Sequence, residues 1–218
     1  MIEKIRISLW DIFTFSFSGF LVAALVTGHT LVFKLITLAD VKDFLIGLPV
    51  TTSLFVIPFG LTLVGLLLEP VANYFDKYIL HPLWVKAIAE KDKHKTEEKV
   101  LEKEIRENFL GKLNGKIENP YSICKEYVET KQLSTTFMVF LSRYGFYRNV
   151  SFLFFVSGVT DLFISSSWGI GVGILIIWWI LAWTAKKRAQ DFYSYLAPTV
   201  YRCFLIDKAF DNLEEKET

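Results

Sequence analysis

The sequence predicts an all-α integral membrane protein with four transmembrane helices and an α-helical cytoplasmic module. The first reason is composition, because 52% of the 218 residues are hydrophobic and the mean hydropathy is +0.37, which is high for a soluble domain. The second is patterning: the apolar residues gather in blocks as long as a membrane crossing, and alternating runs of strand-forming residues are absent. The third is that most of the 24 Lys and Arg lie in segments predicted on one side of the membrane.

The first two crossings are predicted from apolar blocks at residues 7–33 and 45–68. The first block contains only Asp11 as a charge. It is too long for a signal-peptide core and no small-residue cleavage site follows, so we expect a retained anchor. Pro49 suits the first turn of the second helix, whereas Pro58 lies inside it and is expected to kink it. A kinked helix in lipid needs neighbours for its freed carbonyl group, which favours a packed bundle.

A transmembrane helical hairpin is predicted from residues 150–185. This run has 36 residues, roughly twice the length of about 20 residues that one crossing needs. Turn-forming serines and glycines divide it at 165–171, SSSWGIG. Glycines in the two halves are expected to permit close helix approach; they are Gly158, Gly169, Gly171 and Gly173.

Asp161 is the one charge within this hairpin. It precedes the turn by one helical turn, so we expect it near the membrane surface. A carboxylate costs less there than the roughly 2.5–3.5 kcal/mol that it costs at the centre of a spanning helix. Two interpretations remain open. In one, Asp161 is a hairpin-tip residue satisfied by water or nearby hydroxyl groups; in the other, it faces inward and lines a pore or vestibule.

The placement of basic residues predicts the orientation of the chain. Fourteen Lys and Arg lie in the long middle segment, and the cluster KKR follows the last crossing directly. Both termini are therefore expected in the cytoplasm, with the protein in a bacterial inner membrane. The predicted organisation is two transmembrane helices in 1–68, a cytoplasmic helical insertion in 69–149, the hairpin in 150–185 and a cytoplasmic helical tail, packing on the insertion, in 186–218.

The insertion and the tail both carry amphipathic helix patterns. In the insertion, apolar residues recur every three or four positions, at Val100, Leu101, Ile105 and Phe109. Asn119 followed by Pro120, and later Ser134, are expected to begin two further helices. The tail has an apolar stripe interrupted at Pro198 and made by Phe192, Tyr193, Leu196, Tyr201, Phe204 and Leu205. We expect this stripe to cover the insertion helices.

The sequence contains no enzyme signature. His29, His81 and His94 are scattered and lack metal-binding companions. A phosphate-binding glycine loop, a nucleophile turn and the Arg–His pairing of helical ribonuclease domains are all missing. Cys124 and Cys203 have no basic partner and are expected to be reduced thiols. We therefore predict a protein that is not an enzyme, with no catalytic residue, no cofactor and no metal.

The densest polar cluster is SRYGFYRNVS, just before the third crossing. One interpretation is an interfacial belt, with aromatic rings at headgroup depth and arginines reaching lipid phosphate. The other is an anion site or partner contact formed by Arg143, Arg148 and Asn149. The two arginines are five residues apart and lie about 140° apart around a helix, so they form a poor clamp by themselves. Glu69 and Asp11 are expected to pair with these arginines and to fix the register of the bundle.

This layout resembles a known kind of protein. Two crossings, a basic insertion carrying SRYGFYRN at its exit, a hairpin ending in KKR and the tail VYRCFLIDKAF are similar to small four-pass bacterial membrane proteins of antiphage loci. The nearest are the membrane accessory proteins of type VI-B CRISPR systems, which accompany RNA-guided RNA-cutting enzymes. The resemblance covers the whole chain as architecture.

The resemblance implies an oligomeric inner-membrane accessory or effector protein of antiviral defence that perturbs or permeabilises the membrane when activated, for example as a pore. The implied partners are the lipid bilayer, further copies of the chain, and a soluble defence protein or a nucleotide- or RNA-dependent signal. No direct DNA binding is expected.

Two other functions remain open. The first is a membrane scaffold or sensor that anchors a soluble cytoplasmic partner without conducting ions, as the amphipathic tail suggests. The second is a small channel or transporter. Such a protein needs polar residues along its spans, and only Asp161, His29 and scattered hydroxyl residues are available.

Overall fold

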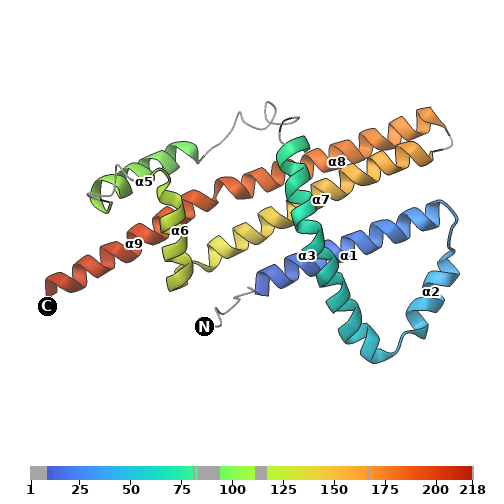
Figure 1. Cartoon of the computed structure of the whole chain (residues 1–218), viewed down its shortest axis with the longest axis horizontal. Coiled ribbons are helices and arrows are strands. Elements are labelled where there is room, and N and C mark those ends of the chain that lie inside the picture. Colours follow the sequence, from blue (N-terminus) through green and yellow to red (C-terminus); the bar gives the residue numbers. More distant parts are fainter. Residues whose placement is uncertain (1–8, 81, 83–93, 111–116, 166, 218) are drawn as a thin grey trace. The chain divides into compact units, whose positions relative to one another are not determined.

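The computed structural model is all-helical over the residues that it describes (Figure 1). These residues are 9–80, 82, 94–110, 117–165 and 167–217. No strand occurs within these ranges, so the all-α prediction is confirmed. The chain divides into two compact units. Unit 1 consists of Met1–Val85 and Ser142–Ala189, and unit 2 of Lys86–Leu141 and Gln190–Thr218.

Three helical stretches among the described residues are long and apolar enough to cross a membrane. They lie in Ile12–Val32, Thr52–Leu80 and Trp168–Phe210, with hydropathies of 1.6, 2.1 and 1.8. These three stretches therefore support the prediction of a membrane protein with transmembrane helices. The fourth expected crossing lies at the end of α7 (Thr135–Ile164) and is not among the three. Arg148, Asn149 and Asp161 lower the hydropathy of that helix, so the fourth crossing stays a prediction.

Helices α1 (Leu9–Val32) and α3 (Ile57–Phe75) cross within unit 1 with their backbones in contact (Figure 1). A Cβ atom at Gly19 would lie 1.8 Å from the carbonyl oxygen of Leu61, and one at Gly65 would lie 1.9 Å from that of Phe15. Only glycine fits at either place. Next to this crossing, the hydroxyl groups of two further residues are hydrogen-bonded at 2.7 Å; they are Ser16 and Thr62.

The second apolar helix lies further along the chain than the sequence suggested. Residues 45–47 belong instead to α2 (Leu38–Gly47), a short helix that begins with a capping box between Thr37 and Asp40. A π-helical turn, η1 (Thr52–Val56), then leads into α3, and a second one, η2 (Asp76–Leu80), follows it. Pro58 lies inside this continuous helical stretch, as predicted, and the π-helical turn directly precedes it.

Helices α7 and α8 (Trp168–Ser194) run side by side as a helical hairpin (Figure 1). That both of them cross a membrane stays a prediction. A Cβ atom at Gly158 would lie 2.7 Å from the Cβ of Trp178, so this glycine permits close approach as expected. Gly171 is also closely packed, whereas Gly169 and Gly173 face open space and do not serve that purpose.

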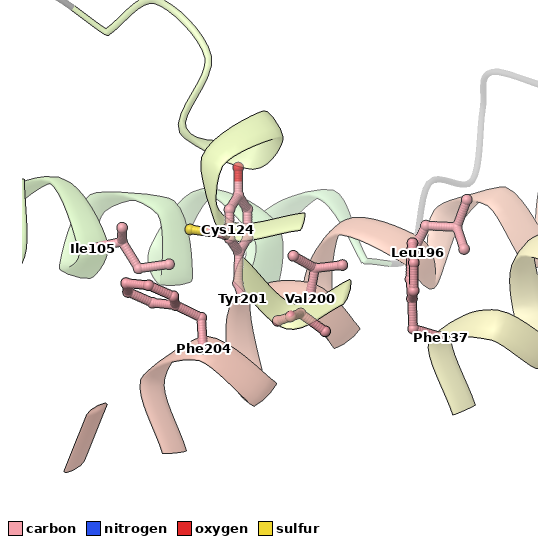
Figure 2. Packing of buried hydrophobic residues seen from close by; sticks show 8 residues of the cluster. Ile105, Cys124, Phe137, Leu196, Val200, Tyr201 and Phe204 are labelled. Carbon is pink, nitrogen blue, oxygen red and sulfur yellow. The ribbon is translucent and has the colours of Figure 1, made fainter. Parts of the chain in front are cut away.

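Unit 2 has a compact apolar core built from two distant segments of the chain. Its helices are α5 (Lys95–Asn108), α6 (Pro120–Lys131), the start of α7, and α9 (Leu196–Glu217). Figure 2 shows Tyr201 and Phe204 of α9 packed among side chains from α5 and α6. The buried cluster is Ile105, Cys124, Val128, Phe137, Leu196, Val200, Tyr201 and Phe204.

The helix starts in unit 2 follow the sequence pattern. Asn119 accepts a hydrogen bond from the Tyr121 backbone N–H at 3.0 Å, and Ser134 accepts one from Phe137 at 3.0 Å, so both caps are confirmed. Pro198 stands in the first turn of α9, so it starts this helix and does not interrupt it. Val100 is 60% exposed and does not belong to the buried stripe.

Both cysteines are free thiols. Cys124 lies in the core of unit 2, where burial raises the pKa of its thiol to about 11.

Candidate functional site

The buried polar side chains described by the structure all belong to unit 1. They are Ser18, Asp76, Ser142, Arg148, Asn149, Ser151, Ser157 and Lys186. A buried polar group is costly unless it has a hydrogen-bonding partner. The partners of these side chains therefore decide whether the residues support the fold or are available to a ligand.

Arg148 is engaged within unit 1. Its guanidinium group donates hydrogen bonds of 3.1 Å each to Glu69 and Asn73 of α3, and it lies over the ring of Tyr144. The predicted pairing of Arg148 with Glu69 is thus confirmed. The side chain of Asp11 lies outside the described residues. Arg143 is exposed on the same helix, and an anion contact there stays a prediction.

A second buried ion pair joins α8 to the end of the second apolar helix. The ammonium group of Lys186 donates a hydrogen bond to Asp76, and the two side chains are only 3% and 9% exposed. Lys186 belongs to the KKR cluster that was used to predict orientation. The structure buries this member of the cluster, whereas Lys187 and Arg188 are exposed.

Asn149 lies in the interior of unit 1. Its amide donates a 3.3 Å hydrogen bond to Ser18 of α1, and its side-chain oxygen is buried without a hydrogen-bond partner. Ser151, two residues further along α7, donates to the Ala182 carbonyl of α8 at 2.8 Å. These contacts link the hairpin helices to each other and to α1. They give Asn149 a structural position, and a contact with a partner protein there stays a prediction.

A further polar group of unit 1 is a three-residue cluster of His29, Asp161 and Trp178, here called the His–Asp–Trp cluster. Trp178 of α8 donates an indole hydrogen bond of 2.7 Å to Asp161 of α7. The imidazole Nε2 of His29, in the last turn of α1, lies 3.1 Å from the other carboxylate oxygen. Gly158 makes room for the Trp178 side chain beside α7. Asp161 therefore has two protein partners, from two different helices.

The hydrogen bonds of His29 determine where its proton lies. Its Nδ1 is 2.6 Å from the Leu25 carbonyl oxygen, which can only accept, so Nδ1 carries a proton. The opposite nitrogen, Nε2, faces a carboxylate oxygen of Asp161. The Nε2 atom is buried and, despite the short distance, makes no hydrogen bond of good geometry.

A cavity of about 730 Å³ opens beside the His–Asp–Trp cluster. The three side chains and Ser165 form its polar wall. Its other walls are mostly apolar and include Ala24, Leu25, Val32, Ile170, Ile174 and Ile177. Gly28 also lines the cavity, and a Cβ atom there would meet no atom within 4 Å. Small-molecule sites are commonly of this size and character, at about 300–1,000 Å³.

His29 and Trp178 were not predicted as site residues. A signal for His29 was present, because the predicted first and third crossings run in the same direction and His29 and Asp161 both lie near the ends of them. Trp178 gave no comparable signal within its apolar run. Among the described residues, no three His, Cys, Asp or Glu side chains gather as metal ligands.

Comparison with known proteins returns no relative. Neither a family model, nor a curated protein, nor a solved structure matches the chain.

Proposed function

We propose that this chain is a non-enzymatic membrane protein with four crossings, which anchors a helical module on the cytoplasmic face of a bacterial inner membrane. We further propose that it acts as an accessory protein of antiphage defence, in which the module receives a partner or signal. The membrane part rests on the structure of unit 1. The defence part is supported only by the architectural resemblance to accessory proteins of type VI-B CRISPR systems.

The observation that carries the membrane proposal is that unit 1 buries charged and polar side chains while it exposes large apolar ones. Its interior contains Arg148, Lys186 and Asn149, whereas large apolar side chains such as Phe17 and Phe59 are 59% and 66% exposed. In water this arrangement would leave much apolar surface uncovered. In lipid it is favourable, because lipid covers apolar side chains while polar groups need partners inside the protein.

The fourth crossing is proposed for the apolar end of α7. The polar residues that lower its hydropathy have partners within unit 1, since Arg148 bonds Glu69 and Asp161 bonds Trp178. Such pairing reduces the cost of placing these groups in a membrane.

Labelling with a membrane-impermeant maleimide tests the crossing number. Single cysteines replace Ser167 or Lys208 in a background of Cys124→Ala and Cys203→Ser. With four crossings, the Ser167 position is labelled from outside the cell and the Lys208 position only after lysis. With three crossings, the two positions exchange their behaviour, which would refute the proposal.

The internal pairing of charges favours an anchor over a pore. Arg148, Lys186 and Asp161 are all engaged with other side chains of the same chain, so they are not arranged as a continuous polar path. Two measurements separate the modes: recovery of a stoichiometric cytoplasmic protein from detergent supports the anchor, and dye leakage from liposomes on activation supports the pore.

The size of the purified complex tests the expected homo-oligomer. Loss of phage resistance on deletion of the gene tests the defence role.

A further inference from the structure

We propose that the cavity beside the His–Asp–Trp cluster binds an uncharged amphiphile, with a single hydrocarbon chain and an oxygen-bearing head such as a hydroxyl or ester group. The inference goes beyond the proposed function. It depends only on the structure of unit 1 and holds whether or not the chain acts in defence.

The apolar body of the ligand follows from the lining of the cavity. Nine of the thirteen lining residues are aliphatic, glycine or phenylalanine, contributed by α1, α7 and α8. A hydrocarbon chain entering from the bilayer exchanges one apolar environment for another, so packing against these walls decides whether it binds.

The uncharged head follows from the polar wall. Asp161 already accepts a hydrogen bond from Trp178 and faces His29, and no Lys, Arg or second carboxylate lines the cavity. An anionic head would be repelled by the Asp161 carboxylate and would find no Lys or Arg side chain in the lining. A cationic head would compete with His29 for the same carboxylate. A neutral oxygen avoids both penalties.

The oxygen in the head follows from an unmade hydrogen bond. Nε2 of His29 is buried close to Asp161 but lacks a hydrogen bond of good geometry. Buried polar groups without such a bond are costly. A small turn of the ring would bring Nε2 within reach of an oxygen-bearing ligand head, and the Ser165 hydroxyl on the same wall can supply a further contact.

Photolabelling of the full chain in lipid nanodiscs tests the proposal. The probe is a long-chain alcohol with a diazirine on its chain, and the readout is labelling of residues 164–178 relative to labelling around Phe59, which faces outward. We expect the alcohol to label the cavity preferentially. Probes with the same chain but a carboxylate or trimethylammonium head should show no such preference. Equal labelling by all three probes would overturn the inference.

Two glycine variants provide a matched comparison. Gly28→Leu should fill the cavity without a clash, because a Cβ atom there meets open space. We expect it to reduce cavity labelling about tenfold, the equivalent of about 1.4 kcal/mol of binding free energy. Gly173→Leu also enters open space but lies outside the lining, so it should leave labelling unchanged. Equal effects of the two variants would contradict the proposed site.

A third variant tests the head-group contact without depending on cavity volume. His29→Phe keeps an aromatic ring against Trp178 and removes both nitrogens. We expect the preference for the alcohol over an alkane probe of the same chain length to disappear while chain labelling persists, because the Asp161 carboxylate still disfavours the carboxylate probe. A preference that survives this substitution would exclude His29 from recognition of the head group.

Discussion

Unit 1 buries charged and polar side chains beside apolar ones, whereas the buried cluster of unit 2 is apolar. Unit 1 encloses ion pairs such as Lys186–Asp76 and exposes large apolar residues such as Phe59. Unit 2 encloses an apolar cluster around Ile105 and exposes ion pairs such as Lys103–Glu107, whose side chains are 74% and 61% exposed. The interior of unit 1 is thus partly polar, whereas that of unit 2 is apolar.

The difference indicates that the two units are adapted to different surroundings. Apolar burial stabilises a fold only where the alternative is water, and this describes the core of unit 2. Where the surroundings are lipid, apolar burial gives little, and helices associate through close backbone packing and polar contacts. The Gly19–Leu61 contact and the Arg148–Glu69 pair are of this second kind.

The largest expected effect comes from breaking the buried pair in unit 1. Lys186→Met leaves the carboxylate of Asp76 buried and unpaired, so we expect a loss of about 3–5 kcal/mol in the free energy of unfolding. Thermal unfolding in detergent checks this value. Lys187→Met, at the exposed neighbouring position, should change stability by no more than about 0.5 kcal/mol.

A second substitution in the same ion pair should restore the stability that the first one removes. Replacing both members, with Asp76→Leu and Lys186→Met together, removes the unpaired charge and should recover most of the stability. If the double variant were as unstable as Lys186→Met alone, the loss would not come from an uncompensated buried charge.

In unit 2 the largest effect is expected from a cavity in the apolar core. Ile105 is fully buried, so Ile105→Ala should cost about 2–5 kcal/mol. Val100 lies on the same helix but is 60% exposed, and Val100→Ala should be nearly neutral. Denaturant unfolding followed through α-helical circular dichroism measures both. Similar losses for the two variants would contradict the core described for unit 2.

A charge placed on an exposed apolar position distinguishes the surroundings directly. Phe59 and Val100 are similarly exposed, at 66% and 60%. Phe59→Arg should cost about 2.5–3.5 kcal/mol on insertion if this surface faces the bilayer centre. Val100→Arg should have little effect, because an exposed position in water tolerates a charge. The yield of membrane-inserted protein gives the comparison, and equal tolerance at both positions would argue against lipid around unit 1.

The smallest effect concerns pH and an exposed pair of unit 2. Hydrogen bonds from Arg202 lower the pKa of Glu97 below its usual value of 4.5. Since the folded-state pKa is the lower one, the stabilisation is present above pH 4.5 and is lost as the pH falls through the folded value. Glu97→Gln should therefore make the melting temperature slightly less sensitive to acid. Glu104→Gln, an exposed control on the same helix, should leave that sensitivity unchanged.

Much of the fold was predictable because its signals are local. The cap at Asn119, the turn that begins at Ser165 and most of the apolar stripe of the tail rest on neighbouring residues and lie where they were expected. The turn is shorter than predicted, because α8 already begins at Trp168, and Tyr193 of the stripe is 53% exposed. The second apolar helix was misplaced because Leu45 is apolar in sequence but belongs to the separate helix α2, which a capping box starts at Thr37. Hydropathy alone does not distinguish a short exposed apolar helix from the start of a crossing.

The candidate site was less predictable, since it depends on contacts between distant helices. Asp161 was singled out as the one charge in its run, yet its partners His29 and Trp178 come from residues more than 100 positions earlier and 17 positions later. The glycine contacts of α1 and α3 were also missed. Nothing in the local sequence of Gly19 shows that another backbone passes 1.8 Å from where its Cβ would be.

The split core of unit 2 has a consequence for biosynthesis. Ile105 and Val128 leave the ribosome well before Val200 and Tyr201, which cover them in the finished protein. During that interval the hairpin between them is also synthesised, and the early helices have only each other and the start of α7 as partners. Folding of this module is therefore delayed until synthesis is nearly complete, and nascent chains that stop before α9 should be exposed to chaperones and proteases.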